Sequence, residues 1–391
     1  MKSKSSVLQN QNSPIRFLLL LVLSTVLAAC GSSGGEGGGN NVSPSASDNP
    51  VNIGLSGQVF SVGVGSGRGA LWKMNLNTGR FTKIPGTNWE EDDDYHNLAI
   101  FLLSPAAYEG NEFILRVQNC LPSDTGTSCV VTLDENAIKT KQFVLPGRIN
   151  SIVKMSRDRR YVALTIQYGG SITNDTWLEI YDRDGKLVSD DRVGTTLVNL
   201  SFEWLPDGRL VYSSSAGDER SIYFTSPYSA KVERQLTLPE GQQRTIGEIS
   251  ASPDGKQIVL SLVAEANFAS TKAIPWVVNI DGTNFRQLAF DPHADNLEHT
   301  RINKTKWSYD GRWILLKYGG VIGGSLANPG TLGYLFAVPS DGIRVPLSPY
   351  DATIESTAIQ IFSYWSAAFN EQADSTRNID RWPRMDYDWV P

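Results

Sequence analysis

The segment Ala251-Ser-Pro-Asp-Gly-Lys-Gln-Ile-Val-Leu260 decides the fold, because three variants of it occur elsewhere in the chain. The variants are Met155-Ser-Arg-Asp-Arg-Arg-Tyr-Val-Ala-Leu164, Trp204-Leu-Pro-Asp-Gly-Arg-Leu-Val-Tyr212 and Trp307-Ser-Tyr-Asp-Gly-Arg-Trp-Ile-Leu-Leu316. Their turn aspartates, Asp158, Asp207, Asp254 and Asp310, are 49, 47 and 56 residues apart. A four-stranded antiparallel unit repeated every roughly 40–50 residues is typical of a propeller blade. The sequence therefore predicts an all-β propeller.

A second hairpin turn accompanies each repeat and lets the blades be counted. These turns are Asn77-Thr-Gly79, Asp134-Glu-Asn136, Asp182-Arg-Asp-Gly185, Ser226-Pro-Tyr-Ser229, Asp281-Gly282 and Ser340-Asp-Gly342. Asp-Gly and Asn-Xaa-Gly between β-branched runs favour hairpins, because glycine accepts the positive φ that such turns need. The six turns predict six blades, and seven blades are the alternative.

The first blade indicates how the ring closes. Residues 58–64, 70–76 and 80–84 predict three strands, with no convincing strand before them. Residues 358–365 resemble the first strand of a blade, but no full blade follows them. We therefore expect this C-terminal strand to complete blade 1 as its innermost strand, which leaves no open edge in the ring.

Residues 1–29 have the pattern of an export signal. A cationic start precedes the apolar stretch 17–29, which is too short to span a bilayer as a helix. The stretch ends Leu27-Ala28-Ala29-Cys30, which resembles the lipobox of bacterial lipoproteins. The resemblance implies that residues 1–29 are removed, that Cys30 is lipidated, and that the protein is sorted to the outer membrane. An ordinary secretory signal with a chance cysteine is the alternative.

Three further segments complete the expected organisation. Residues 30–51 are rich in Gly, Ser and Pro, cannot bury a core, and are predicted to be a flexible tether. The propeller is expected over residues 52–369. Residues 370–391 form an aromatic tail that either packs on the propeller or is recognised by a partner.

Charge and cysteine content narrow the possible partners. Removal of the three cations Lys2, Lys4 and Arg16 changes the formal charge from −6 to −9. Phosphate binding needs a basic stripe, and none is visible, which argues against a nucleic-acid partner. Cys120 and Cys129 flank a short loop and are predicted to form a disulfide in an exported protein; a reduced metal-binding pair is the alternative.

The aspartate-turn repeats resemble the TolB/PD40 class of WD40-like propellers over about residues 52–369. The resemblance implies a periplasm-facing propeller that binds protein partners. The chain departs from that class in two respects. Only a linker precedes the repeats, where TolB has an N-terminal α/β domain, and no nucleophile elbow of the propeller peptidases follows a predicted strand.

Candidate functional residues lie in the long connections, which we expect on the face opposite the tight turns. One segment contains consecutive carboxylates and reads as a solvated acidic linker, a cation site or a docking patch for a basic partner. A second segment combines histidines with carboxylates, which suit zinc or manganese, although its spacing matches no known motif. The residues are Glu90, Glu91, Asp92, Asp93, Asp94 and His96 in the first, and His293, Asp295, Glu298 and His299 in the second.

Two functions remain open from the sequence. The first is a non-enzymatic lipoprotein scaffold in the cell envelope that binds a protein or an envelope polymer and needs no cofactor. The second is a metal-dependent lyase or hydrolase that acts on a polysaccharide fragment at the channel mouth, with His293 and His299 as metal ligands. No P-loop or dinucleotide fingerprint is present. The oligomeric state, and the choice between the periplasmic and the extracellular face, stay open.

Overall fold

The computed structural model describes parts of the compact unit Asp48–Pro391. The described residues are 54–65, 68–77, 80–83, 104–106, 112–118, 128–134, 138–145, 148–149, 153–168, 176–189, 191, 193–195, 201–213, 221–239, 245–263, 273–290, 292, 302–318, 334–347, 353–361 and 387–390. Within these ranges the chain forms strands and turns and contains no helix. The prediction of an all-β protein is confirmed.

Most strands belong to six antiparallel sheets, numbered here in chain order. Sheet 1 contains β1 (Gln58–Gly65), β2 (Arg68–Asn75), β3 (Arg80–Lys83) and β27 (Tyr387–Val390). Sheet 2 contains β4 (Ser104–Ala106), β5 (Glu112–Gln118), β6 (Ser128–Leu133) and β7 (Lys139–Leu145). Sheet 3 contains β8 (Arg148–Ile149), β9 (Lys154–Met155), β10 (Tyr161–Gln167), β11 (Thr176–Asp182) and β12 (Val193–Thr195).

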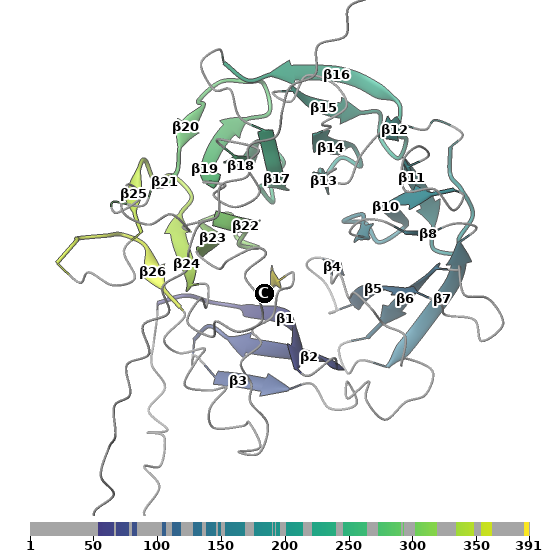
Figure 1. Ribbon diagram of the computed structural model, residues 1–391, viewed down its shortest axis with the longest axis horizontal. Coiled ribbons are helices and arrows are strands. Elements are labelled where there is room, and N and C mark those ends of the chain that lie inside the picture. The colour runs from purple at the N-terminus through teal and green to yellow at the C-terminus, as the bar shows by residue number, and fades with distance from the viewer. Residues whose placement is uncertain are drawn as a thin grey trace, which may run out of the picture. The chain divides into compact units, whose positions relative to one another are not determined.

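The remaining sheets follow the same up-and-down order (Figure 1). Sheet 4 contains β13 (Ser201–Trp204), β14 (Leu210–Ser213), β15 (Ser221–Thr225) and β16 (Val232–Thr237). Sheet 5 contains β17 (Thr245–Ala251), β18 (Gln257–Val263), β19 (Ala273–Asn279) and β20 (Arg286–Gln287). Sheet 6 contains β22 (Ile302–Trp307), β23 (Trp313–Tyr318), β24 (Tyr334–Pro339) and β26 (Ile359–Gln360). Between sheets 5 and 6, β21 (Ala289–Phe290) pairs in parallel with β25 (Val345–Pro346).

The repeated turn owes its sequence to a set of local hydrogen bonds. The Ser252 hydroxyl donates to Asp254 Oδ1 at 2.7 Å and accepts the Gln257 N–H at 2.9 Å. Ser156 and Ser308 make the same two bonds in their own turns. Gly255 follows the aspartate with a φ of 69°, which glycine adopts without a Cβ penalty. The turn is therefore fixed before any packing with other sheets.

The prediction that residues 358–365 pair with the first sheet is wrong. Ile359–Gln360, within the predicted segment 358–365, pairs with β24 as the fourth strand of sheet 6. The strand that pairs with β1 is instead Tyr387–Val390, in the predicted tail. Trp389 explains this choice: its side chain is buried, and its indole N–H donates to the Ser56 carbonyl at 2.9 Å. Residues 362–369 lie outside the described part of the chain.

One strand of each sheet contacts its counterparts in the neighbouring sheets. In chain order, β4 contacts β9, β9 contacts β13, β13 contacts β17, and β17 contacts β22. The C-terminal strand β27 contacts both β22 and β4. These six strands, β4, β9, β13, β17, β22 and β27, are called the inner strands below.

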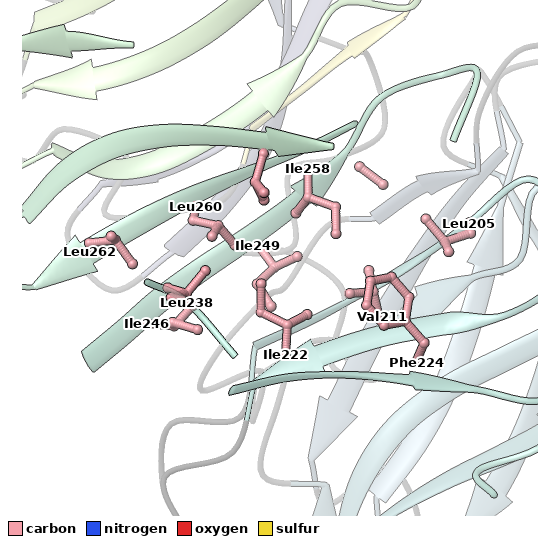
Figure 2. Close-up of a cluster of buried hydrophobic side chains, with 12 residues drawn as sticks. Leu205, Val211, Ile222, Phe224, Leu238, Ile246, Ile249, Ile258, Leu260 and Leu262 are labelled. Atoms are coloured by element: carbon pink, nitrogen blue, oxygen red, sulfur yellow. The ribbon is translucent and has the colours of Figure 1, made fainter. Parts of the chain in front are cut away.

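Apolar side chains fill the space between consecutive sheets. Figure 2 shows the cluster between sheets 4 and 5, where Ile222 and Phe224 of β15 face Ile249 of β17 and Ile258 of β18. All four side chains are buried. Burial of such a side chain stabilises the fold by roughly 1.5–3 kcal/mol, so these clusters dominate the adhesion between sheets.

Replacement of Gly255 by alanine is expected to destabilise the protein by about 2–3 kcal/mol. Alanine at this φ costs about 1–2 kcal/mol, and a Cβ here would lie 2.6 Å from Pro206 Cδ in the preceding turn. Gly54→Ala is the matched control, because Gly54 has a φ of 73° and no atom within 4 Å of its added Cβ. Urea unfolding of both variants measures the difference; equal losses would contradict the close packing of successive turns.

Candidate functional site

Almost all residues proposed from the sequence lie outside the described part of the chain. This applies to Cys30 and Cys120, and to both segments of the proposed binding face. The residues of that face are Glu90, Glu91, Asp92, Asp93, Asp94, His96, His293, Asp295, Glu298 and His299. Cys129 is described and is buried in β6. The disulfide, the lipidation and the metal site therefore stay predictions.

The described ranges contain neither a cluster of metal-ligand side chains nor a helix that could span a membrane. They contain no group of three or more His, Cys, Asp or Glu side chains that could hold a metal ion. Among the same residues, no helix has the length and apolar character needed to cross a membrane.

The inner strands bring together a cluster of charged residues that the sequence had not revealed. Glu203 of β13 accepts a hydrogen bond from Lys154 of β9 at 2.9 Å, and Lys306 Nζ of β22 lies 3.5 Å from the same carboxylate oxygen. The exposed fractions of these side chains are 7% for Lys154, 15% for Glu203 and 21% for Lys306. These three residues are called the inner charged cluster.

The repeat places the three residues at one level. Each lies four positions before its turn aspartate, and the equivalent residue in sheet 5 is Ser250. Lys306 of sheet 6 thus contacts Glu203 of sheet 4, with only a small buried serine at this position of the sheet between them. The cluster therefore joins sheets 3, 4 and 6.

The tryptophans of the repeat bond to the backbone at the same level. The Trp204 indole donates to the Lys154 carbonyl at 3.0 Å, and the Trp307 indole donates to the Ser250 carbonyl at 3.1 Å. In each case the acceptor belongs to the inner strand of the preceding sheet. A buried indole N–H needs such a partner, which explains why tryptophan marks these positions.

The two lysines keep the central carboxylate of the cluster, Glu203, in its ionised form. Burial raises the pKa of Glu203, but the positive charges of Lys154 and Lys306 outweigh burial and lower the pKa to about 2. The pKa of Lys154 is lowered from its ordinary value, because burial outweighs the opposing effect of the adjacent Glu203 carboxylate. One carboxylate between two ammonium groups is suited to holding strands together.

Arg157 adds a second connection between non-adjacent sheets. It lies in the turn after β9, and its guanidinium donates to the carbonyls of Ser252 and Pro253 in the turn after β17. The bond to Ser252 is 2.9 Å long. Sheets 3 and 5 are thereby linked across the turn of sheet 4.

The outer strands carry a second repeated device. Lys141-Gln142-Phe143, Arg234-Gln235-Leu236 and Arg286-Gln287-Leu288 occupy equivalent positions in β7, β16 and the β20 segment. Each basic residue binds the second hairpin turn of the next sheet. Lys141 pairs with Asp184, whereas Arg234 and Arg286 donate to the carbonyls of Ile280 and Ser340. A basic-Gln-apolar triplet was the sequence signal that could have revealed these contacts.

The interface between sheets 3 and 4 uses a different contact on the turn side. The Tyr228 hydroxyl donates to Asp158 Oδ2 at 3.0 Å. The Tyr228 and Tyr161 rings lie 4.6 Å apart between centroids. Tyr228 has a φ of 54°, unusual for a bulky residue. These contacts over-determine its conformation and hold the tyrosine at this positive φ.

Glu179 is a fully buried carboxylate on the opposite side of sheet 3. It accepts hydrogen bonds from the hydroxyls of Tyr168, at 2.9 and 3.0 Å, and of Tyr181. Burial and these hydrogen bonds raise the pKa of Tyr181. Tyr168 stands at the start of the connection from β10 to β11, so this network fixes the position at which that connection leaves the sheet.

Comparison with known proteins gave similarities to solved structures. No protein-family model matches the sequence, and no curated protein matches it. The chain is similar to TolB from Acinetobacter baumannii, with 15% identity, a TM-score of 0.46 and coverage of 73% of this chain. Only 62% of that TolB chain is covered, less than two thirds of its length.

Two β-propeller domains are also similar. That of the Trilobed protease from Pyrococcus furiosus has 13% identity and a TM-score of 0.42, and 75% of this chain and 85% of that domain are covered. That of Myceliophteria thermophila Cps50 (Swd1) has 10% identity and a TM-score of 0.42, with 74% and 86% covered. Similarities at this level carry no information about ligand or activity.

Replacement of Glu203 by glutamine is expected to lower the free energy of unfolding by about 3 kcal/mol, because it removes the carboxylate that pairs with the buried Lys154 ammonium group and with Lys306. Asp184→Asn is the control: it breaks the pair with Lys141 at a site where the Asp184 side chain is 80% exposed, so its loss should be much smaller than that of Glu203→Gln. Denaturant unfolding gives both values. A Glu203→Gln loss no larger than that of the control would refute a stabilising role of the cluster.

The stability of the protein is also expected to depend on pH through Glu203. Its folded-state pKa of about 2 is below the ordinary value of 4.5, so its contribution is present above about pH 5 and is lost as the pH falls towards 2. Between pH 5.5 and 2.5 the wild type should lose about 2 kcal/mol more than Glu203→Gln. Urea unfolding at both pH values tests this; parallel losses in the two proteins would contradict it.

Proposed function

We propose that this chain is a lipid-anchored, six-bladed β-propeller that acts as a non-enzymatic, protein-binding scaffold in the bacterial cell envelope. The observation that carries the proposal is the cyclic series of contacts among the six inner strands. Each inner strand has one neighbour on either side, and β27 joins the last sheet to the second. Six sheets that follow one another in this way around an axis make a propeller.

The same contacts support closure of the ring by β27. Sheet 1 takes three strands from the start of the chain and its inner strand from the end. With β27 in place, β1 has a strand neighbour on either side, so its edge is covered. The apolar cluster of Leu55, Leu76, Ile361 and Trp389 supports this seam, because it joins residues of sheets 1 and 6.

The face with the longer connections is the proposed binding face. The turns between first and second strands of sheets 3 to 6 are each five residues long, and their backbone is fixed by hydrogen bonds. The connections between second and third strands in these sheets have 7 to 15 residues. Tight turns at one end of a scaffold and long connections at the other favour recognition by the latter. The network of Glu179 and Tyr168 supports one of these connections at its base.

The proposed anchor is a lipid on Cys30. The lipobox-like sequence Leu27–Cys30 supports it, and the tether of residues 30–51 leads towards β1. A flexible chain of this length spans roughly 25 Å on average, enough for the propeller to reorient above an outer membrane. The charges of the inner charged cluster pair with one another, which gives these residues a structural role.

The proposal is tested in cells of a bacterial expression host with the whole chain. Cys30→Ala should abolish labelling by radioactive palmitate and move the protein from the membrane fraction to the soluble fraction. Photo-crosslinking residues placed at Asn174 and Asn267, in two of the long connections, should give covalent adducts with an envelope protein. The same residues at Asp184 and Asp341, exposed on the turn side, are the matched controls.

Three outcomes would count against this proposal. Retention of palmitate label in Cys30→Ala would remove the lipid anchor. Adducts formed only from Asp184 and Asp341 would move the binding surface to the turn side, and the absence of adducts at all four positions would oppose the scaffold function.

A further inference from the structure

The C-terminal strand β27 is held in a way that permits exchange between molecules. Among the described residues it pairs with β1 alone, in the register Gln58 to Val390 and Ser61 to Tyr387. Each of the other inner strands is joined to the next strand of its own sheet by a connection of five residues. In contrast, β27 joins its sheet without a hairpin, so its position depends on non-covalent contacts alone.

The recognition elements for this strand are compact. Trp389 inserts among Leu55, Val59 and Leu76 of sheet 1 and Leu315 of sheet 6. The indole hydrogen bond to Ser56 and the four backbone pairs complete the contact. All the residues that receive β27 are contributed by one molecule. A β27 strand from any copy of the chain therefore finds the same complementary edge.

The length of chain before β27 allows it to reach a neighbouring molecule. Twenty-five residues separate Ile361 from Tyr387. At about 3.3 Å per residue they can extend to about 80 Å, whereas a compact domain of this size is about 50 Å across. The tether thus sets no geometric limit on docking in trans.

We propose that β27 exchanges between copies, so that the C-terminal strand of one molecule completes sheet 1 of another. Exchange of an identical element needs no new interface, because every contact of the closed monomer is reproduced in the dimer. A strand that returns to its own molecule competes at an effective concentration on the order of millimolar, so exchange becomes competitive as the local protein concentration approaches that range. The inference goes beyond the scaffold function and does not require lipid attachment.

Disulfide trapping tests the exchange with two differently tagged copies of the whole chain. One carries Gln58→Cys and the other carries Val390→Cys, two positions that are register partners across β1 and β27. The copies are mixed at about 1 mM, near the effective concentration of the tether, and oxidised. A covalent heterodimer on a non-reducing gel is the expected result. Trp389→Ala in the second copy should abolish it.

The matched control uses the other register partner of Gln58. Asn75 faces Gln58 across β1 and β2, which a short hairpin joins within one molecule. Copies with Gln58→Cys and Asn75→Cys should give no heterodimer. A double variant, Gln58→Cys with Val390→Cys in one chain, should form an internal disulfide at low concentration.

Two results would overturn the inference. The first is an internal disulfide in the double variant without a heterodimer in the mixture, which would show that β27 stays on its own sheet. The second is the absence of both products, which would show that β27 does not occupy the edge of β1. In either case the lipid anchor and the binding face remain testable separately.

Discussion

Each of the six antiparallel sheets has four or five strands among the described residues and exposes two faces, so none of them can bury its apolar residues alone. This constraint governs the rest of the structure. Phe224 and Ile249, from consecutive sheets, are buried only because those sheets meet. The polar contacts then fix how the sheets meet: indole-to-carbonyl bonds between inner strands, and basic side chains between outer strands and the next hairpin. Apolar burial supplies most of the adhesion, and directional hydrogen bonds select one arrangement.

The repeat was readable from the sequence because its turn is a local structure. Asp254 and Gly255 sit in a hydrogen-bonded loop that needs no distant partner, so the same residue types recur at each repeat. The strands flanking these turns were predictable for the same reason. The closing strand was not predictable in this way. Residues 358–365 have the composition of an inner strand, but Ile359-Gln360-Ile361 follows the pattern of the fourth strands, in which a glutamine precedes an apolar residue. That pattern becomes visible only when strand registers are compared.

The inner charged cluster shows a different limit of sequence reasoning. Lys154, Glu203 and Lys306 are ordinary charged residues in the sequence, 49 and 103 positions apart. They are equivalent because each lies four positions before its turn aspartate. Lys306 can contact Glu203 because sheet 5, which lies between their sheets, has the small residue Ser250 at this position. The histidines and carboxylates of the long connections were predicted to form a binding or metal site from their composition alone. Composition does not tell whether side chains converge, whereas the register of a repeat does.

Sheet 1 is assembled from both ends of the chain, and this has a mechanical consequence. In the proposed lipid-anchored form, a pull from the membrane would act first on β1, because residues 30–51 precede this strand. The load is shared by its two flanking strands, of which β2 is bound through a hairpin and β27 through four residue pairs and one indole. Under tension the pairing between β1 and β27 would break first. Sheets 3 to 6, which are connected by hydrogen bonds and ion pairs, would stay together. Force would then open the structure at one defined place, the pairing between β1 and β27.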